Sequence, residues 1–200
     1  MSASIGSTFP TTFSPNDPSL TKQLAEADKF KVFIQDAATQ FGFQPCVIAA
    51  IGSRESGWGL ALKPPGPTGT GDFAKRKAKP PLTPGRLPPD NLGFGRGLMQ
   101  IDFDSSSFAQ TGNWRDPQAN IEEGCKILSQ KKTFLNEKKP TLQGGELLRA
   151  TLAAYNAGEG NVLKALNASP PKDVDSVTAN QNYAKDTLNR AGWFQSKGFA

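Results

Sequence analysis

Apolar residues recur at intervals of three and four along most of this 200-residue chain. That spacing is typical of amphipathic helices, so it predicts a mainly helical protein. The first helix is expected to run from Ser19 or Thr21 to Phe41 with Gly42 as its C-terminal cap, and the second to begin at Pro45. Further helices are expected over residues 116–128, 146–155, 161–166 and about 177–194.

The helix that begins at Pro45 carries an apolar run and ends near Glu55. Ile48, Ile51 and Glu55 are spaced at i, i+3 and i+7, which predicts the carboxyl group of Glu55 on the buried face. Burial raises the pKa of a carboxyl group, and a carboxylic acid that keeps its proton near neutral pH is suited to general-acid catalysis. The alternative is a glutamate turned aside at a frayed helix end, bonded to Arg54 or to exposed backbone groups.

The helical pattern is lost over about residues 60–92. This span contains eight prolines and a basic cluster made of Lys75, Arg76, Lys77 and Lys79. So many prolines exclude a regular helix or a central strand. The helical segments on either side are each too small to stand alone, so the span is predicted to be an irregular insertion within one domain.

Glycines alternate directly after the insertion, at Gly93, Gly95 and Gly97. They permit backbone conformations that other residues avoid and allow a ligand to approach closely, and the residues after them indicate a short strand or turn. The expected fold class is therefore α+β and mainly α, with a small irregular or β insertion after the second helix. Residues 1–18 are expected to be a flexible lead, and residues 19–200 a single domain.

Composition narrows the possible partners. The formal net charge is +5 and the isoelectric point is near 9.2, which favours anionic partners in general. No zinc finger, RNA-binding aromatic signature or basic-region heptad supports nucleic acid as the partner. No run of apolar residues is long enough for a membrane helix, and residues 1–16 lack the apolar core of an intact signal peptide.

The chain contains no histidine. Catalytic Ser-His-Asp and Cys-His pairs and histidine-ligated zinc sites are therefore excluded, which leaves proton transfer to carboxylates, Lys or Tyr. The two cysteines, Cys46 and Cys125, match no metal-binding spacing, and both fall on apolar helical segments. The sequence is compatible with two buried free thiols and with a disulfide between them.

Three separated segments together resemble a known family. They are Arg54-Glu55-Ser56, residues 97–102 (Gly-Leu-Met-Gln-Ile-Asp) and residues 154–158 (Ala-Tyr-Asn-Ala-Gly). In this order they are similar to the goose-type lysozymes of glycoside hydrolase family 23, which share their lysozyme-like fold with the soluble lytic transglycosylases. The resemblance runs from about Leu24 to the C-terminus and leaves out residues 1–18 and about 60–92.

The resemblance implies a muramidase that acts on peptidoglycan without a metal or organic cofactor. Glu55 would be the general acid that protonates the glycosidic oxygen between N-acetylmuramic acid and N-acetylglucosamine. Asp102 stands where goose-type enzymes carry an aspartate and lytic transglycosylases typically do not, which favours hydrolysis with inversion. The alternative for Asp102 is a turn or capping residue ahead of Phe103 and Ser105.

A further aspartate of the goose-type enzymes is obscured by the insertion. Counting back from Asp102 brings its expected position to Asn91, and Asp90, one step away, is our choice for the third catalytic residue. Asp72 follows a glycine, as the family's residue does, but it lies much further back in the sequence.

Six residues are predicted to contact the sugar chain. Tyr155 and Asn156 match the family's Tyr-Asn pair, although Tyr155 is equally suited to the core. Gln100 and Met99 are expected in the floor of the cleft, and Trp58 and Phe94 either stack on sugar faces or lie in the core. The basic cluster of the insertion is expected to attract anionic wall polymers.

The implied partner is peptidoglycan or another polysaccharide that contains N-acetylglucosamine. The protein is expected to be a monomer that functions in a secreted or extracellular setting. The alternatives are a lytic transglycosylase, a family 23 chitinase, and a wall-binding protein that keeps the cleft but does no chemistry.

Overall fold

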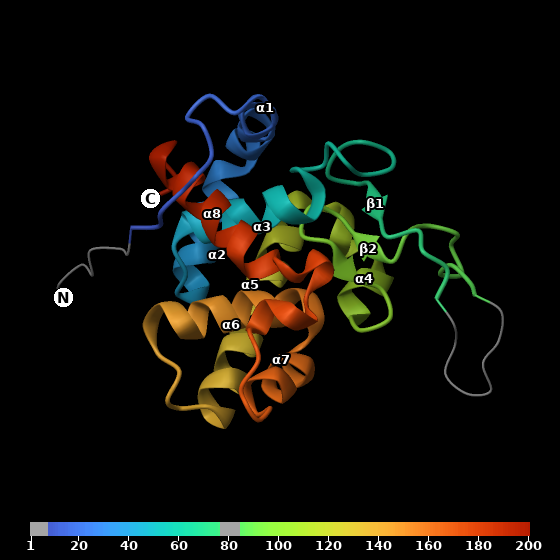
Figure 1. Cartoon of the computed structure of the whole chain (residues 1–200). Helices are drawn as coiled ribbons and strands as arrows, with labels where there is room; N and C mark the ends of the chain where they lie inside the picture. The colour runs from blue at the N-terminus through green and yellow to red at the C-terminus, as the bar shows by residue number, and fades with distance from the viewer. Residues whose placement is uncertain (1–7, 77–84) are drawn as a thin grey trace.

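The computed structural model describes residues 8–76 and 85–200 of the chain. It is mainly helical with one small antiparallel sheet, which confirms the expected fold class (Figure 1). None of the helices in these two ranges is both long and apolar enough to cross a membrane. The helices are α1 (Pro18–Ala27), α2 (Lys31–Phe41), α3 (Pro45–Ser56), α4 (Ser107–Thr111), α5 (Pro117–Lys138), α6 (Gly144–Ala157), α7 (Glu159–Leu166) and α8 (Tyr183–Ser196).

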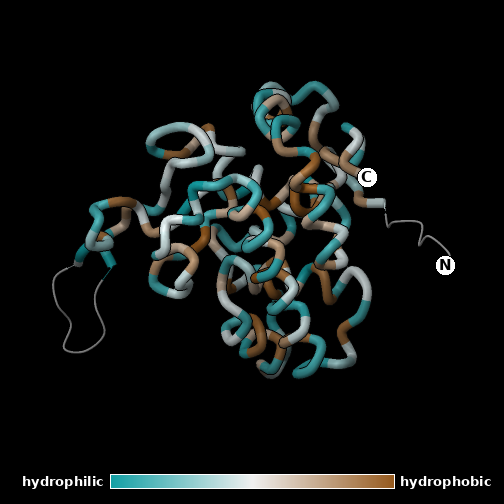
Figure 2. The backbone as a smooth tube through the Cα atoms, turned by 180° about the vertical axis from the view of Figure 1, so that it is seen from behind, coloured by the Kyte–Doolittle hydropathy of each residue, from teal (hydrophilic) through white to brown (hydrophobic). Residues whose placement is uncertain are grey.

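Helix α3 lies at the centre of the core. Residues 46–53 are all buried, and α8 packs against α3 more extensively than any other helix does. A helix that is buried on every side needs no polar face, which explains its continuous apolar run. Trp58 closes one side, because its indole N–H donates to the carbonyl of Ala49 at 2.9 Å and its ring lies against Gly52. Hydrophobic residues alternate with hydrophilic ones along the backbone of the helical body (Figure 2).

The first predicted helix is divided in the structure. A 3-10 turn, η1 (Asp28–Phe30), separates α1 from α2, and the ring of Phe30 stacks against Trp58 with centroids 6.2 Å apart. Gly42 ends α2 in the left-handed conformation at φ 70°, as its position predicted. The apolar periodicity of the sequence continues through residue 30, so it does not predict the division. The division follows from tertiary packing.

Helix α5 begins as its sequence predicted. Asp116 is the N-cap, and its carboxylate accepts from the amide of Ala119 at 2.7 Å. Gly124 in mid-helix allows close contact with Met99, since a Cβ there would lie 2.8 Å from the methionine side chain.

Helix α8 begins later than the expected residue 177. Two 3-10 turns, η3 (Val174–Val177) and η4 (Ala179–Gln181), precede it, and Asn180 has a left-handed φ of 55° that interrupts helical geometry. A further 3-10 turn, η2 (Asn113–Arg115), lies ahead of α5.

The strands β1 (Thr70–Gly71), β2 (Gly95–Arg96) and β3 (Ile101–Asp102) pair antiparallel in that order. The register aligns Gly71, Gly95 and Asp102 across the sheet. The alternating glycines leave room for other parts of the protein, whose atoms lie directly against them. A Cβ at Gly93 would lie 1.9 Å from the carbonyl oxygen of Gly71, and one at Gly95 would lie 2.2 Å from the side chain of Gln100.

The proline-rich insertion includes β1, so it is not wholly irregular. After β1 the chain leads away from the helical body, and a backbone bridge between Arg76 and Arg86 closes the described part of this excursion (Figure 1). Of the basic cluster, Lys75 is exposed and Arg76 turns inward, whereas Lys77 and Lys79 lie outside the described residues.

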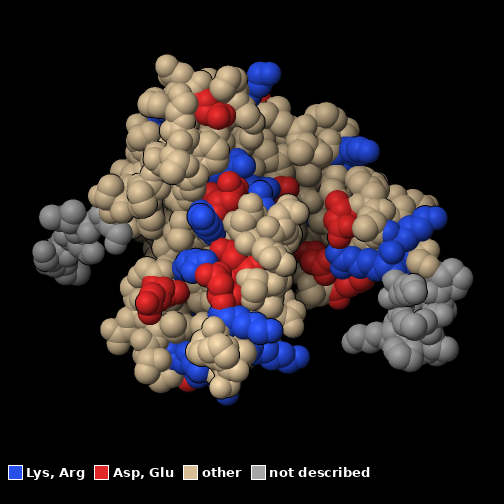
Figure 3. Space-filling view, viewed as in Figure 1, with Lys and Arg blue, Asp and Glu red and all other residues tan. Residues whose placement is uncertain are grey.

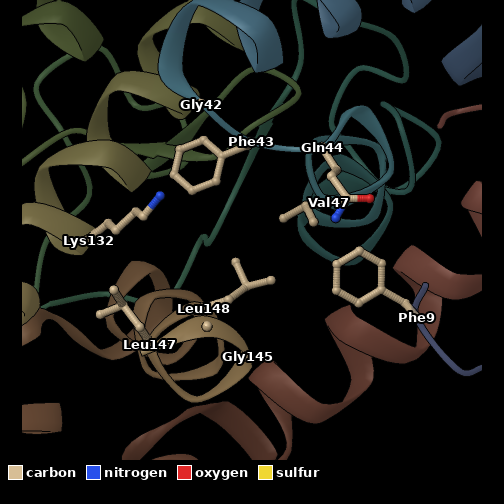
Figure 4. A pocket seen from close by; sticks show the side chains of 10 residues that line it. Phe9, Gly42, Phe43, Gln44, Val47, Lys132, Gly145, Leu147 and Leu148 are labelled. Atoms are coloured by element: carbon tan, nitrogen blue, oxygen red, sulfur yellow. The ribbon is translucent and has the colours of Figure 1, made fainter. Parts of the chain in front are cut away.

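The expected flexible lead does not describe residues 8–17, which lie along α8. The amide of Phe9 donates to Gln195, and the indole N–H of Trp193 donates to the carbonyl of Ser14 at 2.8 Å. Phe9 and Phe13 pack against the core. Phe9 also lines an apolar pocket of about 290 Å³ together with Phe43, Val47 and Leu148, among others (Figure 4). Apolar packing and these hydrogen bonds together hold the segment on the domain.

Candidate active site

Glu55 lies in the last turn of α3, where its side chain is half-buried. Its Oε1 atom accepts a hydrogen bond of 2.5 Å from the hydroxyl of Tyr183, the first residue of α8. Burial raises the pKa of Glu55 to about 7, and the Tyr183 hydrogen bond and the charge of Arg54 only partly oppose that rise. The carboxyl group therefore holds a proton over much of the range below neutral pH, as a general acid must.

Two tyrosines surround the acid. The hydroxyl of Tyr155, in α6, donates to the carbonyl of Met99 at 2.8 Å and does not bond Glu55. Burial, and then the charge of Glu55, raise the pKa of both Tyr155 and Tyr183 well above the ordinary value. Both phenols therefore remain hydrogen-bond donors. Sequence reasoning did not identify Tyr183 as a site residue, because it lies 128 positions from Glu55 and belongs to none of the three segments that carry the resemblance.

The backbone around the acid is held by polar contacts on both sides. Arg54 donates to Asn182 at 3.0 Å and pairs with Asp186 at 3.3 Å, which ties the end of α3 to the start of α8. On the other side, the hydroxyl of Ser56 donates to the carbonyl of Leu98 at 2.7 Å. The acid is thus fixed between α8 and the turn that joins β2 to β3.

Asp102 ends β3 and has two kinds of partner. Its Oδ1 atom accepts from the amide of Ser105 at 3.0 Å and from the Ser105 hydroxyl at 2.9 Å. Its Oδ2 atom lies 2.5 Å from Nη1 of Arg76. The turn-capping alternative raised from the sequence is therefore realised, and it leaves the second carboxylate oxygen directed away from the turn.

The structure brings Asp72, rather than Asp90, to Asp102. Asp72 follows Gly71, which the sheet register aligns with Asp102, and its Oδ2 atom lies 2.5 Å from Nη2 of the same Arg76. The geometry therefore favours Asp72 over Asp90, our choice from the sequence, as the partner of Asp102. Counting back from Asp102 assumed that the insertion precedes the aspartate, whereas most of the excursion follows Asp72.

Asp90 instead pairs with Arg96. Its Oδ1 atom lies 2.9 Å from Nη2 of Arg96, whose fully buried guanidinium lies over the rings of Phe103 and Trp114. Partial burial would raise the pKa of Asp90, but the hydrogen bond from Arg96 lowers it on balance. Asn91, the other position reached by counting, is a turn residue with φ 59°. This pair supports the loop that precedes β2.

A cleft of about 360 Å³ lies beside these groups. Gln100, Asp102, Tyr155 and Asn156 line it, together with Ile127 and Lys131. The amide N–H₂ of Gln100 donates to the carbonyl of Gly97 at 2.8 Å, and the exposed Asn156 accepts from the amide of Ala179 at 2.8 Å. Three of the predicted sugar-contacting residues, Gln100, Tyr155 and Asn156, therefore lie at the cleft.

Three other predicted contacts are core residues. Trp58, Phe94 and Met99 are exposed by only 1%, 2% and 0% of their surface, so their side chains do not face the cleft. The backbone carbonyl of Met99 still contributes by fixing Tyr155. Large apolar side chains are usually buried in folded proteins, and periodicity alone does not separate a core residue from one that contacts substrate.

Cys46 and Cys125 are buried free thiols, and burial raises the pKa of each to about 12. No cluster of three or more His, Cys, Asp or Glu side chains in residues 8–76 and 85–200 is arranged to hold a metal ion. The carboxyl groups at the site are those of Glu55, Asp72 and Asp102.

These carboxyl groups differ in environment. Glu55 is half-buried with a raised pKa, whereas Asp72 and Asp102 lie against a guanidinium at the sheet. Glycoside hydrolysis requires two such unlike carboxyl groups on either side of the scissile bond. The mainly helical fold and this site together define a lysozyme-like glycosidase.

Comparison with known proteins gives the family. The model of the family described as lysozyme g matches residues 89–198, more than half of the chain. The lysozyme g of Casuarius casuarius is 30% identical over 176 residues, covering 88% of this chain and 78% of the relative. The lysozyme g of Gallus gallus is 30% identical over 178 residues, covering 89% and 69%, and that of Cyprinus carpio is 30% identical over 179 residues, covering 88% and 78%. The chain belongs to the lysozyme g family and is a muramidase, a glycosidase that acts on peptidoglycan.

Proposed function

We propose that the protein hydrolyses the β-1,4 bond between N-acetylmuramic acid and N-acetylglucosamine with inversion at the anomeric carbon. Glu55 is the general acid, and Asp102 with Asp72 activates the attacking water. The observation that carries the proposal is the half-buried carboxyl of Glu55, with a pKa of about 7 and a hydrogen bond from Tyr183.

The acid step follows from this environment. As the bond between the anomeric carbon and the glycosidic oxygen breaks, that oxygen takes the proton of Glu55 and leaves as a hydroxyl group. The resulting carboxylate is stabilised by the Tyr183 hydroxyl and by the nearby charge of Arg54, so the site that raises the pKa also accepts the charge that develops.

The water step assigns a role to the aspartates at the sheet. Inverting glycosidases hold their two carboxyl groups roughly 6.5–9.5 Å apart, which leaves room for a water molecule opposite the leaving group. Asp102 or Asp72 takes a proton from that water as its oxygen bonds to the anomeric carbon. A lytic transglycosylase needs no such base, because the 6-hydroxyl of the sugar itself closes an anhydro ring.

The cleft supplies substrate contacts. Gln100, Tyr155 and Asn156 present amide and hydroxyl groups of the kind that hydrogen-bond N-acetyl groups and sugar hydroxyls. Tyr155 is held in place by the Met99 carbonyl, so it is preorganised for the contact. The proposed reaction requires no metal or organic cofactor, and the protein acts as a monomer on cell walls outside the cell.

The test removes the acidic proton of Glu55 while preserving the shape of its side chain. Glu55→Gln should abolish the loss of turbidity of a cell-wall suspension, because the amide has no acidic proton to give. Glu146→Gln is the matched control, since Glu146 is exposed in the first turn of α6 and lines no part of the cleft. Wall lysis by Glu55→Gln at the rate of the control would refute the proposal.

A further inference from the structure

Arg76 lies among three aspartates at the edge of the active site. Its Nη2 atom is 2.5 Å from Oδ2 of Asp72, and its Nη1 atom is 2.5 Å from Oδ2 of Asp102 and 3.5 Å from Oδ2 of Asp104. One guanidinium therefore joins the two aspartates that the proposed function assigns to the attacking water. Acidic and basic side chains lie against each other on this side of the molecule (Figure 3).

The backbone and ring contacts of Arg76 fix where its guanidinium lies. Its amide donates to the carbonyl of Arg86 at 3.1 Å, and the amide of Arg86 donates back at 3.0 Å. The guanidinium lies over the buried ring of Phe94, 4.0 Å from the ring centroid. Phe94 is itself tied to the site, because its amide donates to the carbonyl of Asp72 at 2.9 Å. The insertion thus delivers this side chain in a defined position.

These ion pairs contribute little to stability. The side chains of Arg76, Asp72 and Asp102 are 36%, 40% and 34% exposed, and ion pairs between side chains this exposed contribute little to the free energy of unfolding. Its two closest partners are Asp102, which lines the cleft, and Asp72, which directly follows strand β1. Position, rather than stability, is what distinguishes this arginine.

Charge and shape both suit a positioning role. Partial burial would lower the pKa of Arg76, but the hydrogen bonds that it donates to Asp72 and Asp102 raise it on balance, so its charge is permanent. With Asp104 included, one positive charge faces three negative ones, which leaves 1 − 3 = −2 in the cluster. A planar guanidinium fork presents its two terminal nitrogens in a fixed geometry, which a lysine does not.

We propose that Arg76 is a positioning residue that holds Asp72 and Asp102 in the arrangement that activates water. The inference rests on the proposed function. Ser105 holds Oδ1 of Asp102 and Arg76 holds Oδ2, so the plane of that carboxylate is set from both sides. The same guanidinium sets the distance between Asp72 and Asp102. In this role Arg76 acts through the two carboxylates that it holds.

The consequence is a loss in turnover rather than in binding. Removing the guanidinium leaves the two carboxylates to repel each other and turn apart, and a misplacement near 1 Å costs about 10²-fold in rate. We expect Arg76→Gln to lower kcat by about 10²-fold on soluble peptidoglycan fragments, with KM within about twofold of the wild type. The thermal midpoint should move by only a few degrees, since ion pairs between such exposed side chains contribute little to stability.

Three comparisons make the test specific. Arg76→Lys restores the charge without the fork and should recover part of kcat. Added methylguanidinium should raise the rate of Arg76→Ala and leave that of Glu55→Gln unchanged. Lys75→Gln removes an equal charge from the neighbouring exposed side chain and should keep wild-type kcat, because Lys75 forms no ion pair within the described ranges.

The outcomes separate this inference from the proposed function. If Glu55→Gln is inactive and Arg76→Gln keeps wild-type or higher kcat, the positioning role is overturned and the proposed function stands. Equal losses in Arg76→Gln and Lys75→Gln would also overturn it, since charge alone would then explain the effect. If Glu55→Gln is fully active, the proposed function fails whatever Arg76 does.

Discussion

Tyr183→Phe tests the environment of the acid most sharply. The substitution removes one hydroxyl and keeps the ring that packs at the start of α8. In the wild type this hydroxyl donates to Glu55 at 2.5 Å and favours the ionised carboxylate, so it holds the pKa below the value that burial alone would set. Without it, the pKa of Glu55 must rise.

The size of the rise follows from the energy of the lost bond. A hydrogen bond to a charged group contributes roughly 1.5–3 kcal/mol, and each pKa unit corresponds to about 1.36 kcal/mol. The pKa of Glu55, about 7 in the wild type, should therefore rise by about one to two units. Because the acid acts in its protonated form, the basic limb of the pH–rate profile moves to higher pH by the same amount.

The assay is kcat against pH on soluble peptidoglycan fragments at constant ionic strength, with each profile normalised to its own maximum. Tyr155→Phe is the control, since it removes a hydroxyl that bonds the Met99 carbonyl instead of Glu55. It should move the basic limb much less. A basic limb in Tyr183→Phe that stays at the wild-type pH, or moves to lower pH, would refute the reasoning.

Three further predictions concern stability and reactivity. Folding raises the pKa of Glu55 from 4.5 to about 7, so the native state binds the proton more tightly and the free energy of unfolding falls as the pH rises between these values. Glu55→Gln should lack that fall. In urea titrations its free energy of unfolding should therefore gain about 3 kcal/mol relative to the wild type between about pH 4 and pH 8. Gly124→Ala should destabilise by about 1–3 kcal/mol, because the added methyl would lie 2.8 Å from Met99; an unchanged denaturation midpoint would contradict that contact. Cys46 and Cys125 should react with a thiol reagent only after unfolding, and rapid labelling of the native protein would be inconsistent with their burial.

The sequence predicted those helix ends that local chemistry determines. Pro45 begins α3, Asp116 caps α5, and Gly42 ends α2 in the left-handed conformation. The break at residues 28–30 and the late start of α8 depend on other contacts. Phe30 packs against Trp58, and Asn180 adopts a left-handed φ in an exposed turn whose Ala179 amide donates to Asn156 of α6. Neither feature leaves a mark in the periodicity.

The residues of the site likewise divide into those that the sequence predicts and those that depend on tertiary contacts. Glu55, Asp102 and the Tyr155-Asn156 pair lie in short motifs, so their positions were readable from the sequence. Asp72 reaches Asp102 only through the register of three two-residue strands, which are too short to show an alternating pattern. Arg76 was grouped with a solvated basic cluster, because no sequence pattern shows that a backbone bridge turns it toward the aspartates.

The stereochemistry of the product tests the central claim most directly. Proton NMR of the reducing sugar released in the first minutes, before mutarotation, distinguishes the two anomers. Water activated by Asp102 and Asp72 opposite to Glu55 must give the α-anomer from the β-linked chain. A β-anomer would instead indicate a double displacement, and a 1,6-anhydro sugar a transglycosylase; either product would contradict hydrolysis by this arrangement of carboxyl groups.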